Sequence, residues 1–310
     1  MKRIIAIVLV LATMCAACLT LSSCGDDSAD YTIGICQLMK HDALDASTQG
    51  FIDGLTAKMT EAGKTVKFDT QVAGEVNLCT TVINTFTAKK VDLILANATP
   101  ALTAAAEATT TIPVLGTSVT DYDSTFNNQI PANVSGTSDG VPFADQAQMM
   151  IDTLNLVAGD KVGVLYCATE SNSVYQYEAV KALFESKGIV VTAYTFSDAA
   201  TELQGITNKA ATESKAIYIP SDNTVSANEA VVDEVCTSLN TPVFTSYGGD
   251  ICYASLAIDY YELGYKTGLM AAEILLNGKS PADLEIAYCT PSVQYNEERC
   301  AQLGIAIPQN

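Results

Sequence analysis

The chain alternates short apolar segments with amphipathic segments of helical period, and this alternation restricts its fold more than any other feature. Residues 216–219 (AIYI) have the character of a buried strand, and a helix-like pattern begins near Val225. The same order recurs at residues 91–100 and 161–187. Strands that alternate with helices form parallel sheets that are covered by helices on both faces. The sequence therefore predicts an α/β fold.

The number of strands indicates two lobes. We expect roughly ten strands, which is too many for a single Rossmann-type unit. The rhythm breaks at residues 122–140, where Asn, Asp, Ser and Gly are frequent. We interpret this break as the junction between two similar α/β lobes.

Polar residues gather where the expected strands end and the helices begin. Any one of them could be a helix cap or a turn former, but runs of three or four in both halves exceed what a cap needs. In open α/β sheets, ligands bind beyond the carboxyl ends of the strands, where helix N-termini offer free N–H groups. We call each junction between the end of a strand and the start of the next helix a corner. We expect the polar residues of these corners to line one binding cleft. The residues concerned are Gln37, Thr99, Ser118, Ser171, Asn172, Ser173, Ser221, Asp222 and Asn223.

The first residues have the composition of an export signal. Lys2 and Arg3 precede an apolar run, residues 4–21, and the run closes on Leu-Ser-Ser-Cys at Cys24. This order is typical of a secretory signal peptide, and the ending resembles a bacterial lipobox. We expect a signal peptide at residues 1–23, a lipidated Cys24 and a polar tether at residues 24–30. An uncleaved membrane anchor is the alternative.

Composition excludes several classes of function. The net charge of −19 disfavours nucleic acid and anionic surfaces as partners. His41 is the only histidine, and the cysteines show no regular spacing, so we expect neither a metal nor a cofactor. Seven cysteines beyond Cys24 are expected to be buried thiols. An exported α/β hydrolase is an alternative, but G-x-S-x-G is absent.

With these corners located, most of the chain after Cys24 resembles a known family. The matching segments are residues 33–38, 41–45, 91–100 (VDLILANATP), 171–174, 221–225 (SDNTV) and 258–264. They are similar to the lipid-anchored substrate-binding proteins of bacterial ABC importers, in the group related to tryptophan- and phenylalanine-binding proteins. The resemblance implies a type 1 periplasmic-binding fold, with two Rossmann-like lobes of parallel-sheet core joined by a three-strand hinge. It places lobe 1 at residues 31–138 plus 260–285, and lobe 2 at 139–259 plus 286–310.

The resemblance also implies a function and residue roles. The protein would be an extracytoplasmic monomer, held to the membrane by its lipid anchor, that passes an amino acid to an ABC permease; a sensory lipoprotein is the alternative. An aromatic amino acid is favoured. Asp222 would accept from the ligand ammonium, and residues 171–173 and Asn223 would bind its charged groups. Further expected contacts are Thr99 and Ser118 from the other lobe, Gln37, Tyr247 and Asp259, the last of which could instead hold a crossover.

Overall fold

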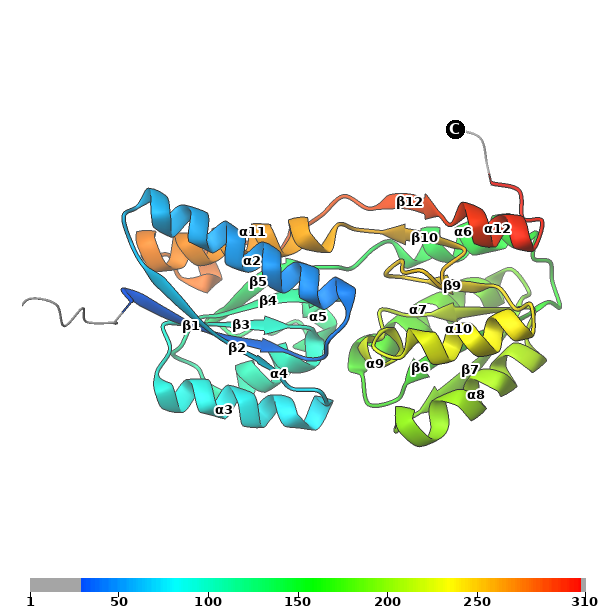
Figure 1. Ribbon diagram of the computed structural model, residues 1–310, viewed down its shortest axis with the longest axis horizontal. Helices are drawn as coiled ribbons and strands as arrows, with labels where there is room; N and C mark the ends of the chain where they lie inside the picture. The colour runs from blue at the N-terminus through cyan, green and yellow to red at the C-terminus, as the bar shows by residue number, and fades with distance from the viewer. Residues whose placement is uncertain (1–28, 308–310) are drawn as a thin grey trace, which may run out of the picture. The chain divides into compact units, whose positions relative to one another are not determined.

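The computed structural model describes residues 29–307 (Figure 1). The predicted signal peptide and the lipidation site at Cys24 lie outside the described residues. Within residues 29–307, no helix combines the length and the apolar character that a membrane span requires.

The first sheet has six parallel strands in the order β11-β5-β4-β3-β1-β2. Helices α2 and α11 cover one face and helices α3 and α4 cover the other (Figure 1). The strands are β1 (Tyr31–Gln37), β2 (Val66–Val72), β3 (Leu93–Asn97), β4 (Val114–Val119), β5 (Val134–Ser138) and β11 (Ala287–Tyr288). The helices are α2 (Asp42–Glu61), η1 (Val76–Leu78), α3 (Cys79–Lys89), α4 (Thr99–Ala108), α5 (Tyr122–Thr125), α11 (Tyr260–Asn277) and η2 (Pro281–Asp283).

The second sheet has four parallel strands in the order β7-β6-β8-β9. Strands β10 and β12 form a separate, two-stranded antiparallel sheet. The strands are β6 (Lys161–Cys167), β7 (Val190–Phe196), β8 (Ala216–Ile219), β9 (Val243–Thr245), β10 (Ala254–Ala257) and β12 (Ser292–Tyr295). The helices are α6 (Phe143–Leu154), α7 (Ser171–Ser186), α8 (Ala199–Glu213), α9 (Asn223–Ser226), α10 (Glu229–Ser238) and α12 (Glu297–Gln302).

The chain passes between the two halves three times: after β5, between β10 and α11, and after β11. The two parallel-sheet cores predicted from the sequence are therefore present. The segment interpreted as the junction, residues 122–140, contains β5, whose sequence VSGTS is too small and polar to resemble a core strand. Residues 287–288, assigned to lobe 2, pair with β5 in the first sheet. The other lobe boundaries stay predictions.

Helices α2 and α11 lie side by side over the first sheet, with their backbones in direct contact (Figure 1). A Cβ atom added to Gly264 would overlap the carbonyl oxygen of Ser47, and one added to Gly50 would overlap that of Tyr261. Only glycine allows this approach. The packing fixes α11, which follows the second crossover, against the helix that begins at the predicted site.

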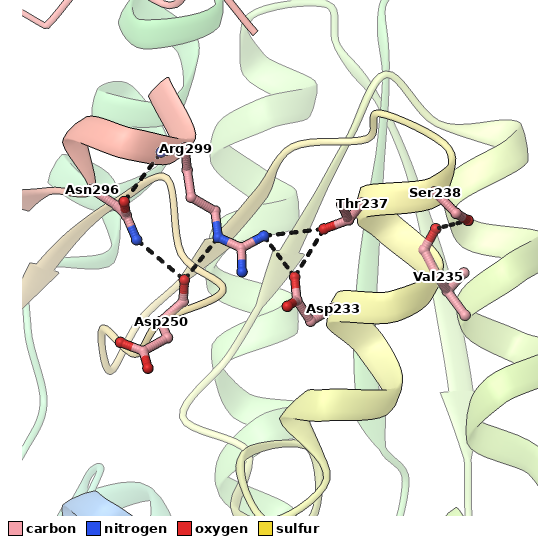
Figure 2. A network of polar contacts seen from close by, with 7 residues as sticks. All are labelled: Asp233, Val235, Thr237, Ser238, Asp250, Asn296 and Arg299. Atoms are coloured by element: carbon pink, nitrogen blue, oxygen red, sulfur yellow. Dashed lines mark hydrogen bonds and ion pairs between the residues drawn. The ribbon is translucent and has the colours of Figure 1, made fainter. Parts of the chain in front are cut away.

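Arg299 fastens the C-terminal helix α12 to the second half of the molecule (Figure 2). Its Nη1 lies 2.6 Å from Asp233 Oδ1 and donates to Thr237 Oγ1 at 3.1 Å, while Nε donates to the carbonyl of Asp250 at 2.9 Å. Arg299 is the only arginine among the described residues. Because these contacts occupy its guanidinium, residues 29–307 offer no other arginine that could bind a ligand carboxylate.

Candidate ligand-binding site

A small cavity lies where the carboxyl ends of strands from both sheets meet. Its walls come from the start of α2, the end of β4, the β5–α6 connection, the β8–α9 corner, the segment after β9 and the start of α11. This is the location at which open α/β sheets bind ligands. The lining residues are His41, Ala43, Leu44, Ser118, Asp139, Ser221, Asp222, Asn223, Ser226, Tyr247 and Tyr260.

Asp222 stabilises the β8–α9 corner through hydrogen bonds that its buried carboxylate accepts from α9, β6 and α7. Its Oδ1 accepts from the backbone N–H of Val225 at 2.8 Å, which caps α9. Its Oδ2 accepts from the backbone N–H of Cys167 at 2.7 Å and from Ser173 Oγ at 2.8 Å. The side chain is 1 % exposed, and burial together with the nearby Glu170 raises the pKa of Asp222 to about 8. Both oxygens are thus already bonded, which leaves little capacity for a ligand ammonium.

Glu170 joins the β6–α7 and β8–α9 corners. Its fully buried carboxylate accepts from Asn223 N at 3.1 Å and Nδ2 at 2.6 Å. It also accepts from Thr224 N at 2.8 Å and Oγ1 at 2.7 Å. Asn172 Nδ2 also donates to this carboxylate, at 3.4 Å. Five donors around one carboxylate make a rigid joint, and they fix which way the Asn223 amide points. Sequence reasoning missed Glu170, although it directly precedes the polar run at residues 171–173.

His41 lies opposite Asn223 and closes one side of the cavity. Because Asn223 Nδ2 is committed to Glu170, its Oδ1 faces His41 Nε2, at 3.3 Å. Burial lowers the pKa of His41, so the ring is neutral. In a neutral ring with one nitrogen facing an acceptor, Nε2 carries the proton and Nδ1 is an acceptor. Nδ1 is buried and has no partner. The sequence had indicated only a turn or rim role for His41.

Asp139 follows β5 at the first crossover and supplies a second unpaired acceptor. Its Oδ2 accepts from the Tyr260 hydroxyl at 3.0 Å, whereas its buried Oδ1 has no partner. The residue is 6 % exposed. Burial raises the pKa of Asp139 to about 6, although the Tyr260 hydrogen bond opposes the shift. Sequence reasoning missed this carboxylate because it had assigned the ammonium to a strand-end corner.

Ser118 and Tyr247, both predicted from the sequence, also line the cavity. Ser118 has a φ of 54°, a left-handed conformation that is costly for a residue other than glycine and is found at functional sites. Its hydroxyl lies 3.0 Å from that of Ser47 at the start of α2. Burial and the neighbouring Glu229 carboxylate raise the pKa of the buried Tyr247 hydroxyl.

Three further predicted residues line a neighbouring pocket. They are Thr99, Ser171 and Asn172, and the buried Oγ1 of Thr99 and Oδ1 of Asn172 have no partner. Thr99 is the first residue of α4; the N-cap is Ala98, not Thr99 as the sequence had indicated. Ser173 is buried and reaches the site only through Asp222.

The structure does not bring Gln37 or Asp259 to the cavity. Gln37 Nε2 donates to Asp45 Oδ1 at 2.6 Å, and its Oε1 accepts from Thr48 Oγ1 at 2.6 Å, so Gln37 holds the first turns of α2. Asp259 is exposed and caps α11 by accepting from the N–H of Glu262 at 2.9 Å. Both residues therefore position helices that border the site. Among residues 29–307, no group of three or more His, Cys, Asp or Glu side chains could hold a metal ion.

Comparison with known proteins assigns this fold and site to a class. The family model described as ABC transporter substrate binding protein matches residues 32–310. The chain therefore belongs to the ABC transporter substrate-binding proteins, which are extracytoplasmic solute-binding proteins and not enzymes. The predicted resemblance to ABC substrate-binding proteins of the tryptophan- and tyrosine-binding group is confirmed, and so is the two-lobed α/β fold. The hydrolase alternative is excluded.

Particular relatives refine this class. A tyrosine-binding protein of Clostridioides difficile (strain R20291) is 32 % identical over 269 residues, which cover 84 % of this chain and 77 % of that protein. An ABC domain from Streptococcus pneumoniae, solved in complex with L-Trp, is 29 % identical with a TM-score of 0.79 over 89 % of this chain and 96 % of that one. A conserved domain protein from Vibrio cholerae O1 biovar El Tor is 31 % identical with a TM-score of 0.83, over 90 % and 96 % of the two chains.

Proposed function

We propose that this chain binds an aromatic α-amino acid in the cavity and delivers it to an ABC permease. Two similar proteins support the ligand class, since one is named for tyrosine and the other was solved with L-Trp. The cavity itself presents two aromatic side chains, Tyr247 and Tyr260, beside its polar groups.

The observation that carries the proposal is the presence of two buried, unpaired acceptors in one small cavity. They are His41 Nδ1 and Asp139 Oδ1. A buried polar atom without a partner costs about 1–3 kcal/mol, so folded proteins rarely keep several together. A ligand that brings N–H groups into the cavity would satisfy both acceptors.

A comparison of two relatives also supports a ligand site between the lobes. A ligand-free, open structure of a substrate binding protein from Clostridium difficile is 31 % identical to this chain but has a TM-score of only 0.66. The L-Trp complex reaches 0.79 at 29 % identity. At nearly equal identity, the present structure therefore fits the ligand-bound relative better than the open one. A ligand would enter after the lobes part and would be enclosed when they close.

A thermal-shift screen tests the proposed function. The form that begins at Gly25 retains the whole described fold, which starts at Tyr31. We expect L-tyrosine, L-tryptophan or L-phenylalanine to raise the melting temperature, since a ligand at a hundredfold excess over its Kd adds about 2.7 kcal/mol of stability. No shift with any of the three, together with a shift from a sugar or an aliphatic amino acid, would contradict the aromatic assignment.

The membrane attachment belongs to the same proposal. Cys24 ends the Leu-Ser-Ser-Cys motif and would carry the lipid that holds a monomeric receptor beside its permease. Two or more acyl chains anchor a protein stably, whereas one chain anchors it only marginally. We expect Cys24→Ser to leave the protein unprocessed or to release it from the membrane fraction. A mature-length variant that still sediments with membranes would remove the support for lipidation.

A further inference from the structure

The cavity is rich in hydrogen-bond acceptors and poor in positive charge. Asp139 and Asp222 contribute carboxylates, and none of the lining residues is a lysine or an arginine. Arg299, the one arginine among the described residues, is occupied at α12. A ligand carboxylate would therefore meet only hydroxyl and N–H groups here, without a cationic partner.

The two acceptors that lack partners are identified by their surroundings. Asp139 Oδ1 is free because Tyr260 occupies only the other oxygen. His41 Nδ1 is free because the fixed Asn223 amide places the ring proton on Nε2. Both atoms lie in the wall of the same cavity. Together they accept two N–H groups, and an ammonium group offers three.

Asp222 is the less suitable carboxylate for this role. Its two oxygens already accept from Val225 N, Cys167 N and Ser173 Oγ. Each of these bonds holds a corner of the second sheet, so a ligand would have to compete with the fold. Asp139, by contrast, has one oxygen that accepts from Tyr260 and a second, buried oxygen that has no hydrogen-bond partner.

From these contacts we infer that Asp139 is the ammonium anchor of the site, that His41 Nδ1 is the second acceptor, and that ligands are selected by their amino group more than by their carboxylate. This inference rests on the proposed function and names the chemistry by which the site chooses its ligand. The class of ligand is a primary alkylamine that carries an aromatic ring, and an aromatic α-amino acid is one member of this class. A deaminated aromatic acid would place its carboxylate against Asp139 and would be rejected.

The test measures binding by titration calorimetry at pH 7.5 with matched probes. The probes are L-tyrosine, tyramine and 3-(4-hydroxyphenyl)propionate, and the corresponding series from L-tryptophan is tryptamine and indole-3-propionate. We expect each amine to bind within about tenfold of its amino acid. We expect each acid to lose about 30-fold or more, as removal of one partner of a buried charge pair does. An acid that binds as tightly as its amine overturns the inference.

The protein side of the test uses Asp139→Asn, with Asp145→Asn as the control. Asp145 is an exposed residue in the first turn of α6, close to Asp139 in the chain but outside the cavity lining. Asp139→Asn should weaken L-tyrosine and tyramine by about 30-fold or more, and the control should change both by less than about threefold. Asp139→Asn that binds within threefold of wild type overturns the inference while the proposed function stands. Wild-type protein that binds none of the six probes removes the proposed function, and the inference with it. If Asp139→Asn does not fold, the comparison of amines with acids on wild type still decides.

Discussion

Removal of the Asp139 charge should stabilise the empty protein while it weakens ligand binding. Burial raises the pKa of Asp139 from an ordinary 3.8 to about 6. A difference of about two pH units in pKa corresponds to about 3 kcal/mol between the folded and unfolded states. In Asp139→Asn the amide keeps an acceptor for Tyr260, but its NH₂ group replaces the unpaired Oδ1 and costs about 1–2 kcal/mol. The net expectation is a gain of about 1–2 kcal/mol at pH 7.5.

The pH dependence gives this prediction its sign. Because the pKa of Asp139 is higher in the folded than in the unfolded protein, the folded state binds the proton more tightly. The ionised carboxyl therefore destabilises the fold above pH 6, and this penalty disappears as the pH falls toward 4. The titratable groups that face Asp139 are Tyr260 of α11, Tyr122 of α5 and, across the cavity, His41, Asp222 and Tyr247. All of these are common to wild type and variant.

Urea unfolding without ligand, at pH 7.5 and pH 4.5, measures the effect. Asp139→Asn should be the more stable protein at pH 7.5, and its advantage should vanish or reverse at pH 4.5. Asp145→Asn, with an exposed charge at a helix N-terminus, should lose only a few tenths of a kcal/mol. Asp139→Asn that is less stable than wild type at pH 7.5, or that differs equally at both pH values, would refute the assignment of a destabilising buried charge.

Two further predictions concern the scaffold around the site. Gly264→Ala should lower the free energy of unfolding in urea by about 1–3 kcal/mol, since its Cβ would overlap the Ser47 carbonyl. In the control, Gly205→Ala in α8, the new Cβ meets no atom within 4 Å. This control should be neutral or stabilising by up to about 1 kcal/mol. Equal effects of the two substitutions would contradict the backbone contact of α2 and α11. Arg299→Met should cost about 1–3 kcal/mol and return the lowered pKa of Asp233 toward its ordinary value. Lys215→Met, which removes an exposed ion pair with Asp160, should cost under about 1 kcal/mol. A smaller loss of stability from Arg299→Met than from Lys215→Met would contradict the conclusion that the Arg299 contacts in Figure 2 fasten α12.

The strand-end corners could be predicted from the sequence because local pattern determines them. A buried strand followed by Ser, Asp and Asn places polar groups at the edge of a parallel sheet, so Ser118, Asp222 and Asn223 were located at the cavity. Strand β5 was missed because its residues, Val134–Ser138, are mostly small and polar, and it becomes buried only between β4 and β11.

The division of roles among the acidic residues could not be predicted. Asp222 and Asp139 both precede helices, and nothing local distinguishes them. The difference comes from distant partners: Cys167 and Ser173 fill the oxygens of Asp222, whereas Tyr260 fills only one oxygen of Asp139. The free nitrogen of His41 likewise depends on Asn223, which lies on the other side of the cavity. Such assignments need the tertiary structure.

A crystal structure with a bound ligand would show whether an aromatic amino acid lies in this cavity with its ammonium on Asp139. The form that begins at Gly25 would be crystallised with whichever of L-tyrosine, L-tryptophan and L-phenylalanine gives the largest thermal shift. We expect a ligand enclosed by His41, Tyr247 and Tyr260, with its nitrogen within hydrogen-bond distance, about 2.7–3.2 Å, of Asp139 Oδ1. A ligand bound elsewhere, or one whose carboxylate faces Asp139 while its ammonium lies on another group, would contradict it.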